Sequence, residues 1–301
     1  MYRVGFILNG RSSNKRSFYK RLDHARHSHG NLEFNVIETS QAGHATSLAS
    51  EFLKDGYTHV IAVGGDGTLH ETLNGFLKNE RKEAILGSLP SGTANDFLKT
   101  TESPTDVTSL FEAILNDHHE AIDIGHIHHS GGSEYFINIA DLGIGAEVVK
   151  RVNSSRKLLG AHMTYFSAIA KTFATYKNRH VVCQADSWKY DGLVNSLVIG
   201  NGRFFGNGMC IAPEASIYDG TFQVIVIGNI TIRDYLRHLN QIKRGELIEH
   251  PEVHYYEATH LKIDGDIVCG IEADGELIGK VPAEILLVPG KIRFLTGRRR
   301  P

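Results

Sequence analysis

The chain has 301 residues, of which 41% are hydrophobic and 22% charged, and its formal net charge is −2. This length suggests about two domains, and the composition is that of an ordinary globular protein rather than a disordered one. The near-neutral charge argues against nucleic-acid binding, because proteins that bind nucleic acids usually carry a strong basic excess.

The first 122 residues alternate between strand and helix patterns. Strands are predicted at residues 4–8, 32–38, 60–63 and 85–89, and helices at 17–27, 45–54, 69–78 and 105–115. Alternation of this kind indicates a parallel sheet that is covered by helices on both faces. Ligands of such sheets bind beyond the carboxyl ends of the strands, so the loops that follow these strands are the candidate site.

From about residue 122, short strands with hairpin signals replace this alternation. Strands are predicted at 122–128, 135–140, 181–185, 193–199, 221–226, 261–263, 267–272, 277–278 and 284–288, and helical segments at 162–176 and 231–244. This spacing predicts an antiparallel β-sandwich or a partly open barrel. We therefore predict an α/β domain at 1–122, to which the chain end at about 290–301 can return, and a β-rich domain at 123–289.

The sequence carries no sign of a membrane span or of export. No apolar run approaches the roughly eighteen residues that a span needs, and residues 1–9 have a strand pattern rather than that of a signal peptide. Three widely spaced cysteines fit neither a disulfide framework nor a Cys-x-x-Cys metal site. We expect a cytoplasmic protein, or one that is peripheral on the inner face of the membrane. Basic residues near both chain ends form either solvated surface or a face toward anionic lipid or phosphate.

The most informative motif is Gly64-Gly65-Asp66-Gly67-Thr68, which lies between a predicted strand and a predicted helix. Glycines let the backbone turn sharply, with positive φ where needed, and approach a ligand closely. The unpaired N–H groups and the dipole of a helix N-terminus then favour an anion. We interpret the turn as a phosphate site, with Asp66 placed to handle the metal ion of the phosphate. A plain tight turn is the alternative. No GxxxxGK[ST] sequence occurs, which excludes a P-loop site.

Three further loops follow predicted strands in the same way. They are Asn9-Gly10-Arg11-Ser12-Ser13, Thr39-Ser40-Gln41-Ala42-Gly43-His44-Ala45 and Ser91-Gly92-Thr93-Ala94-Asn95-Asp96-Phe97. Taken alone, the polar side chains of the last two loops are also explained as caps of the helices that follow.

Together these motifs resemble those of the diacylglycerol kinase catalytic-domain family of lipid kinases, in its bacterial branch. The wider superfamily includes NAD kinases and phosphofructokinases, whose nucleotide domains the first half is expected to resemble. The resemblance implies that the nucleotide is contacted by Asn9, Ser12, Thr39, Gly64, Gly65, Asp66, Gly67, Thr68, Leu69, His70 and Thr93. The chain departs from the family pattern where Gly10 replaces proline, Ser13 replaces glycine and His70 replaces a common asparagine.

In the second half, residues 213–221 match the Pro-x-Ala-x-x-x-Asp-Gly pattern of the family. Members of the bacterial branch hold a structural Mg²⁺ here. The resemblance implies that Ser216 and Thr221 bind the ion through backbone carbonyls and Asp219 through its carboxylate. Oxygen ligands of this kind suit Mg²⁺, and an ordinary Asp-Gly turn is the alternative.

Asp274-Gly275-Glu276, read alone, is a hairpin turn between two strands. The Asp-Gly-Glu motif of the family stands at this position, and the resemblance implies that Glu276 accepts a proton during catalysis. Phosphoryl transfer needs an oriented hydroxyl, a bridging metal ion and charge stabilisation. Glu276 would supply the first requirement, and Asp66 with Mg²⁺ and the amides of the glycine turn would supply the others.

The resemblance therefore implies an enzyme that uses ATP and Mg²⁺ to phosphorylate a lipid hydroxyl at a membrane surface. The α/β domain would bind ATP and the β-rich domain the lipid. Diacylglycerol, giving phosphatidic acid, is the leading substrate; a sphingoid base, phosphatidylglycerol or another hydroxylated lipid remains open. Apolar residues of the stretch 158–173 either line the lipid cleft or belong to the core. The sequence is compatible with a homodimer and does not fix the oligomeric state.

Two other functions are weighed against this one. An NAD kinase-like enzyme acting on a soluble substrate would share the glycine turn, but its second motif normally begins Asn-Glu, and here Asp96 follows Asn95. A nucleotide-binding regulator without turnover is disfavoured because both Asp66 and Glu276 are present.

Overall fold

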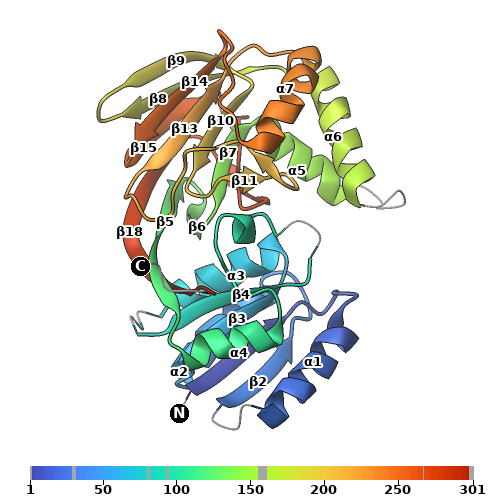
Figure 1. Cartoon of the computed structure of the whole chain (residues 1–301). Helices are drawn as coiled ribbons and strands as arrows, with labels where there is room; N and C mark the ends of the chain where they lie inside the picture. Colours follow the sequence, from blue (N-terminus) through green and yellow to red (C-terminus); the bar gives the residue numbers. More distant parts are fainter. Residues whose placement is uncertain are drawn as a thin grey trace. The chain divides into compact units, whose positions relative to one another are not determined.

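The computed structural model describes residues 2–28, 32–79, 81, 83–92, 95–154, 161–266 and 268–297 (Figure 1). The chain divides into two compact units. The first unit contains residues 1–122 and 290–301, and the second contains residues 123–289. Strand β18 (Ala283–Leu295) begins in the second unit and ends in the first, so the chain end returns to the unit in which the chain began.

The first unit is built on a parallel sheet. Its strands, in spatial order, are β2 (Leu32–Glu38), β1 (Tyr2–Leu8), β3 (His59–Gly64), β4 (Ile85–Pro90) and the end of β18, each parallel to its neighbour. β3 is buried along its whole length, as expected for a central strand of a sheet covered on both faces.

Helices cover both faces of this sheet. They are α1 (Lys15–Ser28), α2 (His44–Lys54), α3 (Asp66–Leu77) and α4 (Val107–Leu115), with a short 3₁₀ turn at Phe97–Lys99. Phe18 of α1 and Phe111 of α4 pack on Phe6 of β1, whereas Phe52 of α2 lies against Gly5 on the opposite face. The predicted parallel α/β arrangement is confirmed. α3 begins at Asp66, three residues earlier than predicted, so the Gly-Asp-Gly segment is already part of the helix terminus.

The second unit contains a six-stranded antiparallel sheet. Its spatial order is β14 (Val253–Ala258), β13 (Phe222–Ile227), β10 (Ser196–Gly200), β7 (Ile139–Gly143), β16 (Gly270–Ala273) and β17 (Glu276–Lys280). The unit also contains β6 (Gly132–Phe136), β8 (Arg179–Ala185), β9 (Lys189–Val194) and β15 (His260–Gly265), with the short pair β11 (Phe204–Phe205) and β12 (Met209–Cys210). β5 (His119–His129) begins in the first unit and continues into the second.

Side chains from the two sheets of this unit meet in one apolar core. Leu197 and Val224 of the six-stranded sheet are buried in the same cluster as Val181 of β8, Leu261 of β15 and Ile285 of β18. Sheets that face each other across interdigitating apolar residues form a sandwich, so the predicted antiparallel sandwich is confirmed.

The helices of the second unit, in the part of it that the structure describes, are α5 (Ile144–Ser154), α6 (Ala161–Thr175) and α7 (Ile232–Arg244) (Figure 1). Ile144 of α5, Ile169 of α6 and Ile242 of α7 belong to one apolar cluster. α6 and α7 were predicted, but α5 was not. Thr231 caps α7 through a capping box, and Gly245 ends the helix with φ 69°.

Candidate functional site

The loops at the carboxyl ends of β1, β2 and β3 are joined by hydrogen bonds. The Asn9 side-chain Nδ2 donates to Thr68 Oγ1 at 3.1 Å, and the Asn9 amide donates to the Val63 carbonyl at 2.9 Å. The Gly10 amide donates to Thr39 Oγ1 at 3.1 Å. Asn9, Thr39 and Thr68 come from three separate segments of the sequence, and all three were predicted to contact one ligand. The structure brings them together.

The loop after β4 joins the same group. Ser12 Oγ lies 2.7 Å from Ser91 Oγ, and the amides of Ser91 and Gly92 donate to the Gly64 carbonyl at 2.9 and 3.1 Å. Ser91 also lines a small cavity of about 190 Å³ that includes Arg21. Ser91 was not predicted as a contact residue, although it begins a motif that was recognised. Thr93, which was predicted, lies outside the described residues.

Close packing explains the glycines of this region better than unusual backbone angles do. A Cβ on Gly64 would lie 2.3 Å from Thr68 Oγ1, and a Cβ on Gly92 would lie 2.7 Å from the Gly65 Cα. Gly65 itself has φ −106°, so the expectation of positive φ in this turn is wrong at that residue. Among the described residues, the atom nearest to a Cβ there is the Gly92 Cα, at 3.6 Å. The described residues therefore leave space beside Gly65 at the helix N-terminus.

Asp66 and Gly67 form the start of α3. The Thr68 and Leu69 amides donate to the Gly65 carbonyl, which closes the first turn of the helix. The first N–H groups of a helix lack intrahelical acceptors, and with the helix dipole they favour an anion at this point. The side chains of Leu69 and His70 are only 2% and 4% exposed, so they have little surface to offer a ligand.

In the second unit, Asp274 and Gly275 form a two-residue turn between β16 and β17, with φ of 52° and 87°. The predicted hairpin is therefore present. The Asp274 carboxylate accepts hydrogen bonds from the amides of Ile137, Asn138 and Ile139 at 3.1, 2.9 and 3.3 Å. Asp274 is buried, whereas Glu276 is exposed at the start of β17. Of these two carboxylates, Glu276 is the one that solvent or a substrate can reach.

The predicted metal ligands lie in the segment that leads into β13. The Thr221 amide donates to Asp219 Oδ1 at 3.1 Å, and the Gly220 amide donates to the buried Asp123 at 2.8 Å. Burial raises the pKa of the Asp219 carboxyl, and the charges of Asp123 and Glu257 raise it further. A bound cation would neutralise part of the negative charge at this turn, and oxygen atoms are the ligands that Mg²⁺ prefers, so the residues present fit this ion.

A metal ion at this turn would depend on backbone oxygens. In the part of the chain that the structure describes, no three side chains of the His, Cys, Asp and Glu types gather as a metal site. The predicted ligand set of two carbonyls, from Ser216 and Thr221, and one carboxylate is consistent with this finding. Asp123 was not predicted, because nothing in the sequence relates it to Gly220, which is 97 residues away.

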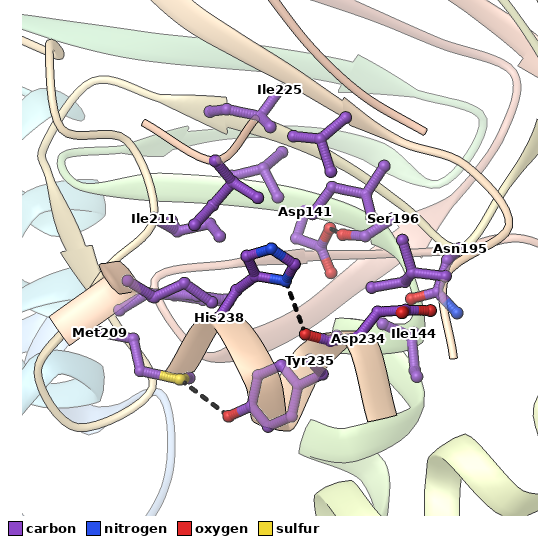
Figure 2. Close-up of a pocket in the computed structure, with 18 of the residues that line it drawn as sticks. Asp141, Ile144, Asn195, Ser196, Met209, Ile211, Ile225, Asp234, Tyr235 and His238 are labelled. Atoms are coloured by element: carbon purple, nitrogen blue, oxygen red, sulfur yellow. Dashed lines mark hydrogen bonds between the residues drawn. The ribbon is translucent and has the colours of Figure 1, made fainter. Parts of the chain in front are cut away.

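An apolar pocket lies between the six-stranded sheet and the helices of the second unit (Figure 2). Its cavity measures about 110 Å³. Ile144, Ile169, Phe173, Met209 and Ile225 are among the residues that line it. Ile169 and Phe173 belong to the stretch that was considered for the lipid cleft, and both face this pocket. Leu158 and Leu159 of the same stretch lie outside the described residues.

Among the described residues, no helix is both long and apolar enough to cross a lipid bilayer.

Two family models match the sequence, one in each half. The model described as the diacylglycerol kinase catalytic domain matches residues 3–127. The model described as the YegS C-terminal NAD kinase beta sandwich-like domain matches residues 138–296, which is more than half of the chain. The order of the two matches is the order of the two units in the structure.

Curated relatives agree with these matches. A diacylglycerol kinase from Staphylococcus saprophyticus is 28% identical over 265 residues, covering 88% of this chain and 85% of that protein. A diacylglycerol kinase from Staphylococcus aureus is 27% identical over 282 residues, covering 93% of this chain and 88% of that protein.

Solved structures share the fold. The crystal structure of a diacylglycerol kinase from Bacillus anthracis superposes with a TM-score of 0.70 at 20% identity, covering 98% of this chain and 96% of that one. A second structure from the same strain has a TM-score of 0.77 at 23% identity, covering 98% and 97%. At these identities the likeness concerns the fold alone.

Proposed function

We propose that this chain, which belongs to the diacylglycerol kinase family and is a kinase, transfers the γ-phosphoryl group of ATP to a lipid hydroxyl. We further propose that the lipid is diacylglycerol and the product phosphatidic acid. The observation that carries the proposal is the hydrogen-bonded group of loops around Asn9, Thr39 and Thr68, which stands at the N-terminus of α3.

ATP is assigned to the first unit. Its phosphates would meet the N-terminus of α3, where the absence of a side chain on Gly65 leaves room for them. Asn9, Ser12 and Thr39 are already held by one another and by neighbouring loops, so little ordering is needed when the nucleotide binds. Thr68 and Thr93 complete the proposed nucleotide contacts.

Mg²⁺ would supply charge neutralisation on the phosphates when it is bound, and Asp66 is the carboxylate proposed to hold it. Glu276 is proposed to accept the proton of the lipid hydroxyl. Asp274 is proposed to act through its three amide hydrogen bonds, which fix the hairpin that carries Glu276. We assign Asp274 as a positioning residue and Glu276 as the general base.

The second unit is proposed to bind the lipid and a structural Mg²⁺. The apolar pocket under α5, α6 and α7 supports the first assignment, because a hydrocarbon chain gains free energy when it leaves water for an apolar surface. The cluster of carboxylates around Asp219 supports the second. The proposal places the enzyme at a membrane surface, since its substrate resides there.

The test is transfer of labelled phosphate from ATP to lipids in mixed micelles. The panel contains diacylglycerol, sphingosine, phosphatidylglycerol and, as a soluble acceptor, NAD. We expect label in phosphatidic acid and none in the NAD product. Label only in the NAD product would assign the protein to a soluble acceptor, and ATP binding without any product would make it a nucleotide-binding regulator.

A further inference from the structure

One side chain in the apolar pocket breaks the pattern of its surroundings. In the six-stranded sheet, Asp141 of β7 pairs with Val198 of β10, and Val198 pairs with Ile225 of β13. All three residues line the pocket, so they form one row across the sheet. Every residue of β7 is buried, and strands of this kind usually carry apolar residues throughout. Position 141 has a carboxylate instead.

Only one of the two oxygens of the Asp141 carboxyl has a hydrogen-bond partner of normal geometry among the described residues. Asp141 is 0% exposed, and its Oδ1 accepts a hydrogen bond from the Ser196 hydroxyl. Oδ2 is buried and makes no hydrogen bond of normal geometry with the described residues, although the Gly145 and Leu142 amides lie near enough to favour the ionised form. A buried polar atom without a partner is destabilising, so a carboxyl kept in this state indicates a partner that comes from outside the chain.

The pocket has room for the carboxyl and holds it in place. A Cβ on Gly145 would lie 1.8 Å from Oδ2, so only glycine at this position leaves the carboxyl its space. Figure 2 shows Asp141 beside Ser196, with Tyr235 and His238 of α7 among the other labelled residues of the pocket. The remaining lining is mostly aliphatic and aromatic.

The protonation state decides what Oδ2 can offer a ligand. Burial raises the pKa of Asp141 to about 7, so the neutral acid is well populated near neutral pH. Because the Ser196 hydroxyl donates to Oδ1, the proton of the neutral acid resides on Oδ2. The group is then a hydrogen-bond donor inside an apolar pocket, and its complement is an acceptor oxygen attached to a hydrocarbon chain.

The cavity volume limits how much hydrocarbon can enter. An apolar cavity of roughly 150 Å³ holds a benzene ring, and this one, at about 110 Å³, is narrower. A segment of one chain fits such a space, whereas two chains side by side do not. An ester carbonyl at the head of a single acyl chain is therefore the ligand atom that suits both the space and the donor.

We propose that one acyl chain of the lipid substrate enters this pocket and that Asp141 Oδ2 donates a hydrogen bond to the ester carbonyl oxygen of that chain. This inference rests on the proposed lipid kinase function and makes it more specific. It makes Asp141 a specificity-determining residue that distinguishes acyl lipids from alkyl ether lipids of the same length.

The experiment compares two substrates that differ only in the carbonyls, 1,2-dioctanoylglycerol and its diether analogue 1,2-dioctylglycerol. The kcat/KM for each is measured in mixed micelles with wild type, Asp141→Val and Asp141→Asn. Valine removes the donor, and it suits a buried strand. Asparagine keeps a donor, because its oxygen can accept from Ser196 while its NH₂ points into the pocket. Ile225→Val is the matched control, which changes the pocket wall without changing a polar atom.

A neutral hydrogen bond has a net effect of roughly 2- to 12-fold on binding. We therefore expect the ester-to-ether ratio of kcat/KM to fall by about this factor in Asp141→Val. Asp141→Asn should retain most of the wild-type ratio, and Ile225→Val should change both substrates alike. Since both substrates are measured in the same preparation, loss of folded protein lowers both rates equally and leaves the ratio unchanged.

Three results would overturn the inference. If Asp141→Val keeps the wild-type ratio while diacylglycerol is phosphorylated, Oδ2 binds only water, and the proposed function stands without it. If the wild-type enzyme phosphorylates sphingosine or phosphatidylglycerol but neither of the two glycerols, the lipid kinase function stands and the ester contact does not. If no lipid is phosphorylated by the wild type, the proposed function fails and the inference fails with it.

Discussion

Two carboxylates of the β16–β17 hairpin, Asp274 and Glu276, should respond to substitution in different ways. Asp274 is buried and accepts three backbone hydrogen bonds, whereas Glu276 is exposed at the beginning of β17. We predict that Asp274 substitutions lower the stability of the protein and that Glu276→Gln lowers turnover without changing stability. The two effects are measured independently, so each carboxylate is a control for the other.

The size of the Asp274 effect follows from its contacts. Asp274→Asn keeps Oδ1 and its bonds to the Asn138 and Ile139 amides, but turns an NH₂ group toward the Ile137 amide. Leaving that buried N–H without an acceptor costs about 1–3 kcal/mol. In a unit of this size 1 kcal/mol shifts Tm by roughly 2–4 °C, so Tm should fall by about 2–12 °C. Asp274→Ala removes both acceptor oxygens and with them all three hydrogen bonds, and it should cost about 3 kcal/mol or more.

Glu276→Gln keeps the size and polarity of the side chain and removes the proton acceptor. At an exposed position its effect on stability should stay within about 0.5 kcal/mol. General-base assistance is worth roughly 10²–10⁴ in rate, so kcat should fall by that factor. The affinity for ATP should not change, because the lost interaction belongs to the transition state.

The assay combines calorimetric melting with phosphate transfer to diacylglycerol, and kcat is expressed per folded molecule. If Glu276→Gln turns over near the wild-type rate while folded Asp274→Asn is inactive, the general base is Asp274. If both variants turn over normally, the hairpin has no catalytic role and the base lies elsewhere.

Three further predictions concern single residues. Gly65→Val should abolish ATP binding in a folded protein while Gly65→Ala weakens it less, because the larger side chain fills the space beside the N-terminus of α3; unchanged affinity by calorimetry would contradict the site. Asp219→Ala should remove the dependence of Tm on added Mg²⁺. A ligand that binds only the folded state stabilises it by about 2.7 kcal/mol at a hundredfold excess over Kd, and equal Tm shifts in wild type and Asp219→Ala would reject the metal turn. Burial lowers the pKa of His59 to about 4, so the unfolded chain binds this proton first and stability should decline by up to about 3 kcal/mol as pH falls from 6.5 to 4; a His59→Gln variant with the same slope would refute this.

The sequence predicted the architecture well where periodicity is unambiguous. The strands of the first unit have the expected patterns, and both sheet types were predicted. In the second unit, β14 was not predicted, and the predicted strand 135–140 spans the end of β6 and the start of β7. α5 was missed because the segment 139–147 is apolar and rich in glycine, and the strand β7 passes into the helix at Gly143, which has φ 121°. A Cβ on Gly143 would lie 2.4 Å from the Asn195 carbonyl oxygen, and no local sequence pattern contains this contact.

The candidate site was predicted in part for a related reason. Motifs that follow strands locate a residue along the chain, and parallel strands bring their carboxyl ends to one edge, so Asn9, Thr39 and Thr68 could be grouped in advance. The partners of each side chain depend on distant segments and could not be grouped in this way. Ser91 with Ser12 is one such pair, and Asp123 with the turn at Gly220 is another.

Three buried aspartates of the second unit show what the structure adds to the sequence. Asp274 accepts from three backbone amides, and Asp123 accepts from the Gly220 amide, so both hold loops in place. Asp141 is buried at least as deeply, yet its Oδ2 has no partner of normal geometry among the described residues. Residue type and burial are the same in the three cases. What separates the two structural carboxylates from Asp141 is a carboxyl oxygen that lies inside an apolar pocket and has no hydrogen-bond partner of normal geometry in the described part of the chain.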